Sequence, residues 1–191
     1  MTTLNLHRVE SPLGQLLVVI DSDDRVRALE FESHSARLHR RLTEQYGTFD
    51  LNHNDPSAGE TEILAKLAKY FAGDLAALDD IQVMTQGTEF QERVWAALRK
   101  IPAGEVTTYG RLAHDLGYAD GRMARTVGAA IGANPVCAIV ACHRVIGADG
   151  SLTGYSGGLD RKEWLLKHEK AALPIGKKPL GKSAPASTLA L

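Results

Sequence analysis

A cysteine and a histidine stand side by side in the apolar run IVACHRVIG, which covers residues 139–147. Cysteine attacks carbon as its thiolate, and a neighbouring imidazole or cation stabilises that form. Cys142 is followed by His143 and by the cationic Arg144. Neighbouring side chains of a strand point to opposite faces, so a Cys–His pair needs a bend in the chain or an intervening water. The pattern alone leaves two interpretations open: Cys142 is a nucleophile, or it is a small buried residue.

Charged residues elsewhere could support this chemistry. Glu169, in the sequence KHEK, could fold back and orient the imidazole of His143, as a carboxylate does in a catalytic triad. No acidic residue occurs between positions 121 and 148. The arginines of this stretch, which we expect to form a local basic patch suited to phosphates, are Arg122, Arg125 and Arg144.

The second cysteine predicts no further chemistry. Cys137 lies five positions before Cys142, so on a regular strand the two side chains would face opposite ways. A disulfide or a shared metal site is therefore not expected, and Cys137 is interpreted as a small buried residue. None of the seven histidines has a metal-ligand spacing to the cysteines.

The glycine-rich sequence GADGSLTGYSGG, at residues 147–158, is a second candidate for ligand binding. It has neither the GxxxxGK[ST] nor the GxGxxG form of phosphate-binding loops. One interpretation is a flexible connection. The other is a loop that closes tightly over a planar ligand, with Tyr155 and Ser156 available for stacking and hydrogen bonds.

Length and composition restrict the class of protein. The chain has 191 residues, of which 44% are hydrophobic and 24% charged, as in ordinary soluble globular proteins. The formal net charge of −1 means that any basic DNA-binding surface must be local. Two cysteines make no disulfide framework, no signal peptide is apparent, and no apolar run approaches the ~20 residues of a membrane span. We expect a soluble cytoplasmic protein without membrane contact.

The first part of the chain predicts α/β structure. The turn sequences SPLG and DSDD separate three strand-like runs and indicate an antiparallel meander. Two helices follow, the first with Ser35 as its N-cap, and the polar sequence DLNHNDPSAG between them predicts a loop. The predicted elements are strands at 4–10, 16–20 and 26–32, helices at 35–46 and 60–71, a loop at 50–59, and a short strand or extended linker at 78–84.

The rest of the chain predicts a mainly helical unit. Thr88 and Gln91 have the spacing of a capping box, and Thr108 precedes another helix that Gly117 would end. Two short helices joined by a tight polar loop are typical of a helix-turn-helix, but also of many other helical domains. The predicted elements are helices at 88–101, 109–117, 122–134 and 159–170, a strand at 136–146, and a disordered tail rich in Pro, Gly, Lys and Ser.

Several motifs together resemble the O6-alkylguanine-DNA alkyltransferase family, also called methylated-DNA–protein-cysteine methyltransferases. In chain order they are GEVTTYGRLA, MARTVGAAIGANP, IVACHRVIG and GYSGGLDRKEWLL with a following HE, within residues 88–170. The N-terminal segment matches more loosely, through SPLG and YFAG. The resemblance implies an α+β chain with a ribonuclease H-like α/β domain containing a small antiparallel sheet at 1–84, a mainly helical, winged helix-turn-helix domain for DNA binding and alkyl transfer at 85–172, and the tail at 173–191.

The resemblance implies direct reversal of DNA damage. The protein would flip O6-alkylguanine out of the duplex and transfer the alkyl group irreversibly to Cys142, with O4-alkylthymine as a second candidate substrate. It would be a single-turnover methylated-DNA–protein-cysteine S-methyltransferase that needs no cofactor. Its partner would be the minor groove of double-stranded DNA, and it would act as a monomer.

The resemblance implies catalytic roles for five residues. His143 would deprotonate Cys142 through a water, and Glu169 would orient His143. Asn134 would hold the active-site turn against the helix-turn-helix. Tyr109 would hydrogen-bond guanine N3 and crowd the phosphate of the flipped nucleotide.

The resemblance also implies residues that bind DNA. Arg125 would enter the duplex and fill the vacated stack. Tyr155 and Ser156 would close over O6, while the backbone of Cys142 and Val145 would read the guanine amino group. The remaining positions lie on the recognition helix, where small side chains suit a minor groove ~6 Å wide: Ala124, Thr126, Gly128 and Ala129.

The chain departs from the family at one position before the nucleophile. Residue 141 is Ala where the family has Pro, which fixes φ and lacks an amide donor. We expect Ala141 to loosen the chain before Cys142 and to slow transfer without abolishing it. The loop at 118–123 is also longer than in many relatives, which puts the placement of Arg122 in doubt.

Other branches of the family and other classes of protein are distinguished by features of the sequence. The N-terminal part has no cysteine, so the structural zinc of some members is not expected. Non-enzymatic alkyltransferase-like proteins have Trp in place of Cys142. If Ala141 disabled transfer, the alternative would be a module that senses alkylated DNA without repairing it. An unrelated Cys–His hydrolase is disfavoured because Cys142 and His143 are adjacent and no separate triad motif occurs.

Overall fold

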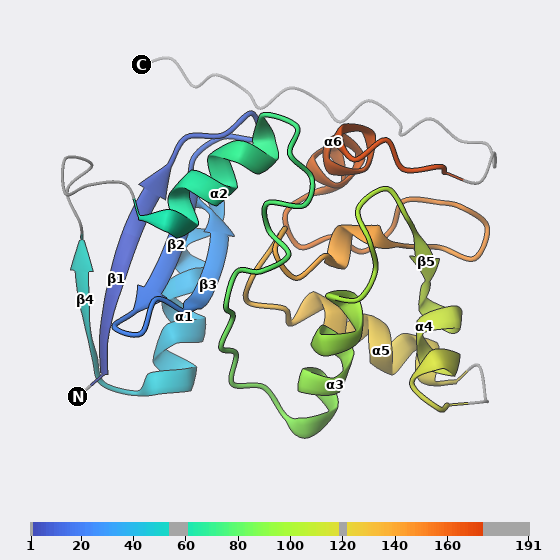
Figure 1. Cartoon of the computed structure of the whole chain (residues 1–191). Helices are drawn as coiled ribbons and strands as arrows, with labels where there is room; N and C mark the ends of the chain where they lie inside the picture. Colours follow the sequence, from blue (N-terminus) through green and yellow to red (C-terminus); the bar gives the residue numbers. More distant parts are fainter. Residues whose placement is uncertain (1, 54–60, 119–121, 174–191) are drawn as a thin grey trace, which may run out of the picture.

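The computed structural model describes residues 2–53, 61–118 and 122–173, and the chain has the predicted α+β class (Figure 1). An N-terminal sheet with helices on its two faces packs against a mainly helical C-terminal part. The predicted tail lies, except for its first residue, outside the described residues, as do positions within two predicted loops. Among the described residues, no helix is long and apolar enough to cross a membrane.

The N-terminal sheet has the strand order β3–β2–β1–β4. Strands β1 (Thr2–Val9), β2 (Leu16–Asp21) and β3 (Val26–Phe31) pair antiparallel, which confirms the predicted meander. Strand β4 (Phe49–His53) pairs parallel with β1, so the predicted loop at 50–59 is wrong at its start. β4 is an edge strand with no buried residue, and its polar sequence therefore gave no strand signal.

Both faces of the sheet are buried. Leu16, Val18 and Ile20 of β2 pack on the face covered by α2 (Glu62–Phe71). Leu17 and Val19 pack on the opposite face with α1, which runs from Ser35 to Tyr46. Alternate residues of one strand therefore belong to different hydrophobic clusters, as the period of two requires.

Two of the predicted helix caps are confirmed. Thr88 and Gln91 form the complete capping box of α3 (Glu89–Leu98), and the Thr108 side chain caps α4 (Tyr109–Asp115). Ser35 is not an N-cap: a 3-10 turn, η1 (Glu32–His34), leads directly into α1, and His34 occupies the cap without a side-chain bond.

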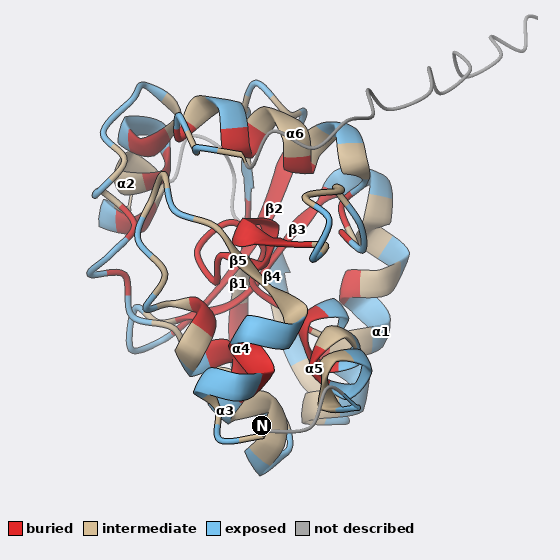
Figure 2. Cartoon of the chain, turned by 90° about the vertical axis from the view of Figure 1, so that its right-hand side faces the viewer, coloured by how far each residue is buried: buried red, intermediate tan, exposed pale blue. Residues whose placement is uncertain are grey.

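The predicted strand at 136–146 is mostly wrong. Only β6 (Val145–Ile146) is a strand, paired parallel with β5 (Thr107–Thr108). Before it the chain turns, with Ala138 at a φ of 64°, and forms a 3-10 helix, η2 (Cys142–Arg144). The run is apolar because it crosses the middle of the molecule, where Figure 2 shows buried residues around β2, β3 and β5, and not because it lies in a sheet.

The two parts of the chain share backbone hydrogen bonds at the free edge of β3. The Leu29 amide donates to the Pro135 carbonyl at 2.9 Å, and the Cys137 amide donates to the Leu29 carbonyl at 3.1 Å. Val83, in the predicted strand or linker at 78–84, makes only an isolated bridge with Val26. The segment that leads to Cys142 is thus fixed to the sheet. The other C-terminal helices are α5 (Met123–Gly132), which packs against α4, and α6 (Leu159–His168).

Candidate functional site

Glu169, directly after α6, accepts hydrogen bonds from three buried side chains. Its Oε1 lies 2.9 Å from His143 Nε2, 2.7 Å from the Tyr70 hydroxyl and 2.7 Å from Arg144 Nη2. Its Oε2 accepts from Arg144 Nε at 2.9 Å. The contact between Glu169 and His143 that the sequence could only suggest is therefore present.

These contacts set the charges of the group. Burial alone would raise the pKa of Glu169, but the hydrogen bonds from His143 and Arg144 hold the pKa well below its usual range. Burial lowers the pKa of His143 despite the neighbouring carboxylate, so the imidazole is neutral near pH 7. Because Nε2 faces the carboxylate as donor, Nδ1 is an acceptor, and it is buried without a hydrogen-bond partner among the described residues.

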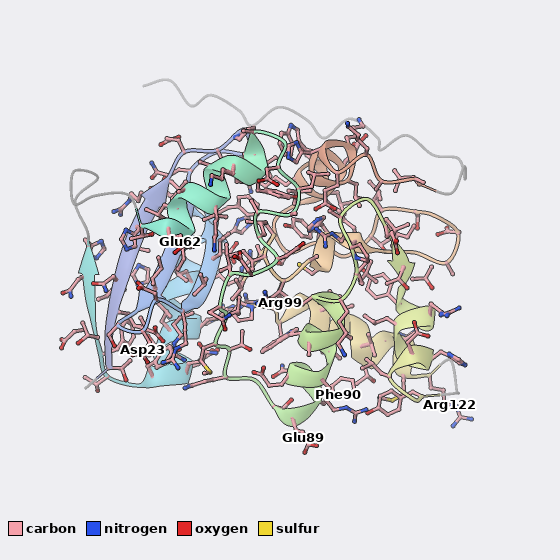
Figure 3. All side chains as sticks on the ribbon, in the orientation of Figure 1. Asp23, Glu62, Glu89, Phe90, Arg99 and Arg122 are labelled. Atoms are coloured by element: carbon pink, nitrogen blue, oxygen red, sulfur yellow. The ribbon has the colours of Figure 1, made fainter. Side chains whose placement is uncertain are left out.

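Arg144 is not part of a phosphate-binding patch, contrary to the prediction. It is 6% exposed, and besides Glu169 it binds the Ile101 carbonyl. The guanidinium neutralises the buried carboxylate, which could not remain ionised alone. Arg122 and Arg125 are exposed, and Figure 3 shows Arg122 at the outer edge of the helical part. The predicted basic patch is reduced to these two residues.

Cys142 begins η2 and is held by Asn134. The Asn134 Oδ1 accepts the Val136 amide at 2.9 Å, and this fixes the orientation of the side-chain amide. Its Nδ2 therefore donates to the Val140 carbonyl at 2.9 Å and lies 3.2 Å from the Cys142 sulfur. Asn134 orders the turn and at the same time offers a donor to the sulfur.

The surroundings of Cys142 favour its thiolate. Hydrogen bonds from the Cys137 thiol and from Asn134, and the positive charge of Lys162, lower the pKa of Cys142 against the opposing effect of burial. The prediction for the two cysteines assumed a regular strand, whereas the segment between them turns at Ala138 and leads into η2. The expected burial of Cys137 is confirmed.

A pocket of about 690 Å³ opens between α4, α5 and the glycine-rich loop. Thr126 and Ala129 lie exposed on α5 beside it, whereas Cys142 and Val145 are buried. A slightly larger hollow of about 750 Å³, between α3 and α4, contains no predicted site residue. The pocket is lined by six predicted residues and three others: Tyr109, Ala124, Arg125, Gly128, Tyr155 and Ser156, with Gly132, Thr153 and Gly154.

The glycine-rich loop packs closely against Tyr109 and Phe31. The Tyr109 hydroxyl donates to the Thr153 carbonyl at 3.0 Å. Gly154 has a φ of 58°, and a Cβ there would lie 2.8 Å from the Tyr109 hydroxyl. A Cβ at Gly157 would lie 2.5 Å from the Phe31 ring. Tyr155 is 8% exposed, and its buried hydroxyl has no hydrogen-bond partner among the described residues.

Sequence reasoning missed several residues that build the site. Lys162 is fully buried, and its Nζ donates to the Val145 carbonyl at 2.5 Å and to the Thr153 carbonyl at 2.6 Å. Burial lowers its pKa to about 8. Arg37 and Arg41 of α1 donate to the backbone of Ser156 and Asn134, respectively. These cations occur in charged stretches that look like solvated helix faces, so the sequence held no signal for these contacts.

A metal site is not formed by the part of the chain that the structure describes. No group of three or more His, Cys, Asp or Glu side chains there could hold a metal ion.

Comparison with known proteins connects this geometry to one family. The sequence profile described as "6-O-methylguanine DNA methyltransferase, DNA binding domain" matches residues 89–171. The methylated-DNA–protein-cysteine methyltransferase of Salmonella typhimurium is 47% identical over 172 residues, which cover 88% of this chain and 97% of the relative.

Solved structures agree with the sequence matches. The crystal structure of Mycobacterium tuberculosis OGT in complex with DNA has a TM-score of 0.69 and 36% sequence identity, over 91% of this chain and 96% of that one. The O6-methylguanine methyltransferase of the same organism has a TM-score of 0.68 and 35% identity, over 92% and 96% of the two chains.

Proposed function

Since this chain belongs to the family of methylated-DNA–protein-cysteine methyltransferases, we propose that Cys142 is the residue that receives the alkyl group. The protein is a DNA repair enzyme that reverses damage by transferring an alkyl group from DNA to one of its own cysteines. One observation carries the choice between its two cysteines: the Asn134 amide lies 3.2 Å from the Cys142 sulfur. This donor favours the thiolate at Cys142, whereas the pKa of Cys137 is raised by its hydrogen bond to Cys142 and by burial.

The proposed mechanism begins with proton transfer. His143 Nδ1 takes the proton of Cys142 through one water, and Glu169 stabilises the imidazolium that forms. The thiolate attacks the alkyl carbon in line with the O6–carbon bond, whose electron pair returns to the base. Guanine takes up the proton, and the sulfur becomes a thioether. A thioether is not readily hydrolysed, so each molecule acts once and needs no cofactor.

The substrate we propose is O6-alkylguanine, flipped out of the duplex into the pocket of about 690 Å³, with O4-alkylthymine as a second candidate. The buried Tyr155 hydroxyl, which has no hydrogen-bond partner among the described residues, is a donor for O6, together with the backbone at Ser156. Tyr109 contacts the base at N3 from α4. The carbonyls of Cys142 and Val145 read the amino group.

We propose that α4 and α5 form the helix-turn-helix and that α5 enters the minor groove. Val127, Ala130 and Ile131 of α5 are buried against the core, which turns its small residues toward solvent and the pocket. Arg125 lies at the rim of the pocket, where its side chain can fill the space left by the flipped base.

Finer aspects of the fold are proposals of the same kind. The order β3–β2–β1–β4, with β4 parallel to β1, suits a ribonuclease H-like N-terminal domain at 1–84. The parallel pair β5–β6 would be the wing of the second domain, at 85–172. One molecule repairs one lesion, so a monomer suffices, and two free thiols suit the reducing cytoplasm.

The alternative, a sensing module without transfer, depended on Ala141. Its φ of −75° lies within the range of proline, so the backbone before Cys142 already has the geometry that proline would impose. This observation favours transfer over sensing.

Free O6-benzylguanine tests the assignment. Incubation should add one benzyl group to the intact mass of the wild type and of Cys137→Ser, but none to Cys142→Ser. A folded wild type that gains no mass, or a Cys142→Ser variant that gains it, would exclude the proposal.

A further inference from the structure

Tyr70 is a buried side chain of the N-terminal part that contacts Glu169 and has no role in the mechanism above. It lies on α2 and is 0% exposed. Its hydroxyl oxygen lies 2.7 Å from Glu169 Oε1. An ionised carboxylate can only accept, so the phenol is the donor. Burial and the neighbouring carboxylate raise the pKa of Tyr70, and the phenol therefore keeps its proton at neutral pH.

The backbone and the ring of Tyr70 are held by neighbouring residues. Its carbonyl accepts a hydrogen bond from His168 Nε2 at 2.7 Å. Its ring meets the rings of Phe71 and His168 edge-on, with centroid distances of 5.3 and 5.2 Å. Because the side chain is also fully buried, the hydroxyl stays directed at Glu169.

Glu169 Oε1 is shared by three donors. The Tyr70 hydroxyl and Arg144 Nη2 each lie at 2.7 Å, and His143 Nε2 lies at 2.9 Å. Together with the bond from Arg144 Nε to Oε2, these contacts use about all the lone pairs that a carboxylate offers. Arg144 supplies the counter-charge of the group, whereas Tyr70 adds a donor without adding charge. Each such donor takes up part of the negative charge that would otherwise act on the imidazole of His143.

We propose that Tyr70 is a positioning residue of the transfer reaction: by donating to Glu169 Oε1, its hydroxyl limits how strongly the carboxylate stabilises protonated His143. The inference rests on the proposed role of His143 as the base for Cys142. Tyr70 keeps its own proton throughout. The proton of Cys142 passes through one water to His143 Nδ1, the sulfur bonds to the alkyl carbon, and the electron pair of the broken O6–carbon bond returns to the base. A restrained imidazole keeps a larger fraction of Cys142 in the unreactive thiol form, which preserves a cysteine that can react only once.

Loss of the hydroxyl should make His143 more basic. A whole opposite charge nearby shifts a pKa by about 1–3 units, so the loss of one neutral donor to that charge should raise the pKa of His143 by less, roughly half a unit. The pair of thiolate and imidazolium then gains about threefold over thiol and neutral imidazole. Well below the pKa of His143 the imidazole is protonated with or without the hydroxyl, so the rates there should coincide.

The neighbours of this group stay in place when only the Tyr70 hydroxyl is removed. The other titratable and charged groups that face Tyr70, Glu169 and His143 are Cys142 and Arg144 of η2, Lys162 and His168 of α6, and Tyr155 of the glycine-rich loop. A change in the pH dependence of Tyr70→Phe can therefore be assigned to the lost hydrogen bond.

The test is the pH–rate profile of benzyl transfer from free O6-benzylguanine, measured on the full chain. The proteins compared are wild type, Tyr70→Phe, Tyr46→Phe and a protein with a fluorinated tyrosine in place of Tyr70. Phenylalanine keeps the ring without the donor, whereas fluorination makes the phenol a stronger donor. Tyr46→Phe is the matched control, because Tyr46 packs against Phe49 in the cluster on the opposite face of the sheet.

Two further measurements accompany the rates. Thermal melts verify that each variant is folded. NMR of ¹⁵N-labelled histidine follows the protonation of His143 directly, and a His143→Gln variant identifies its signal. The NMR titration reports the basicity of His143 even where a variant reacts too slowly for a full rate profile.

We predict that the Tyr70→Phe profile follows that of the wild type at low pH and then reaches a midpoint about half a unit higher and a plateau roughly threefold higher. The fluorinated protein should shift in the opposite direction, and Tyr46→Phe should not shift. A midpoint unchanged in both Tyr70 proteins overturns the inference, as does a Tyr70→Phe rate lowered by the same factor at every pH, which a purely structural role would give. A folded wild type that gains no adduct, or a Cys142→Ser variant that gains one, would instead refute the proposed function itself.

Discussion

Glu169 is the residue on which the charge balance of the site depends. It accepts from His143, Tyr70 and Arg144, and it is the only acidic side chain that pairs with Arg144 within the part of the chain that the structure describes. Removing the carboxylate would leave a buried guanidinium without its counter-charge, which is one of the costlier changes that a folded protein can undergo.

We predict that Glu169→Gln lowers the free energy of unfolding by about 3–5 kcal/mol at pH 7. The substitution should also make the free energy of unfolding less dependent on pH in the acid range. The unfolded chain protonates this carboxyl near its ordinary pKa of 4.5, whereas the depressed pKa keeps the folded form ionised, so wild-type stability falls as pH drops below about 4.5. Urea unfolding between pH 7 and pH 3.5 measures both effects.

Glu163→Gln is the matched control, because Glu163 lies on α6 shortly before Glu169, its side chain is 36% exposed, and its ion pair within the described residues is with Lys167. Equal losses of stability in the two variants would show that the buried carboxylate has no special role.

Ala141 yields a second prediction for a single residue. Its φ of −75° suits proline, and among the described residues its amide donates no hydrogen bond. We therefore expect Ala141→Pro to raise stability by about 0.4–1 kcal/mol, by restricting the unfolded chain, and to leave the transfer rate unchanged. Thermal melts and single-turnover rates on alkylated duplex measure these quantities. A markedly faster Ala141→Pro variant would instead support the expectation from sequence that alanine slows transfer.

Among the elements, α5 is the one for which DNA binding makes the sharpest prediction. Arg125→Ala should slow transfer from alkylated duplex by roughly 10- to 100-fold, because the vacated stack is no longer filled and flipping costs a few kcal/mol. Transfer from free O6-benzylguanine should not change, because no base has to be flipped.

Arg122→Ala removes another exposed charge, just before α5, at a position that does not line the pocket. It should lower duplex affinity and the salt dependence slightly and leave the flipping step intact. If the two variants behaved alike on duplex DNA, Arg125 would contribute only its charge.

The elements also show what the sequence could and could not predict. Helices α2, α3 and α4 followed from apolar periodicity and from Thr108 and the Thr88 capping box, because these are local signals. The run 136–146 looked like a strand because it is apolar and buried. The turn at Ala138 and η2 depend instead on contacts with β3, which is distant in sequence, and with the side chain of Asn134.

For the whole molecule, the sheet and α1 help to hold the active site. Arg41 donates to the Asn134 carbonyl at 2.8 Å and to the Gly132 carbonyl at 3.0 Å, so a helix of the N-terminal part braces the end of α5 and the turn before Cys142. This long-range contact could not be read from the sequence, where RLHRRL predicts only a charged helix face.

We predict that Arg41→Ala lowers stability by about 1.5–3 kcal/mol and slows alkyl transfer, because the Asn134 turn loses its brace. Arg40→Ala is the control: its side chain is 67% exposed and lies 3.8 Å from Glu44, so it should change stability by less than about 0.5 kcal/mol. Urea unfolding and transfer rates of the two variants decide between a brace and a surface charge. Equal changes of stability and transfer rate in the two variants would mean that the contact of Arg41 with the Asn134 turn does not support the site.

The most direct test of the central claim is the fate of an isotopically labelled methyl group placed on guanine O6 in duplex DNA. Trypsin leaves both cysteines in one peptide, residues 126–144, so fragment ions of that peptide must separate Cys137 from Cys142. We predict one label per protein molecule, all of it on Cys142, with unmodified guanine restored in the DNA. Label on Cys137, repeated turnover by one molecule, or DNA binding without any transfer would contradict it.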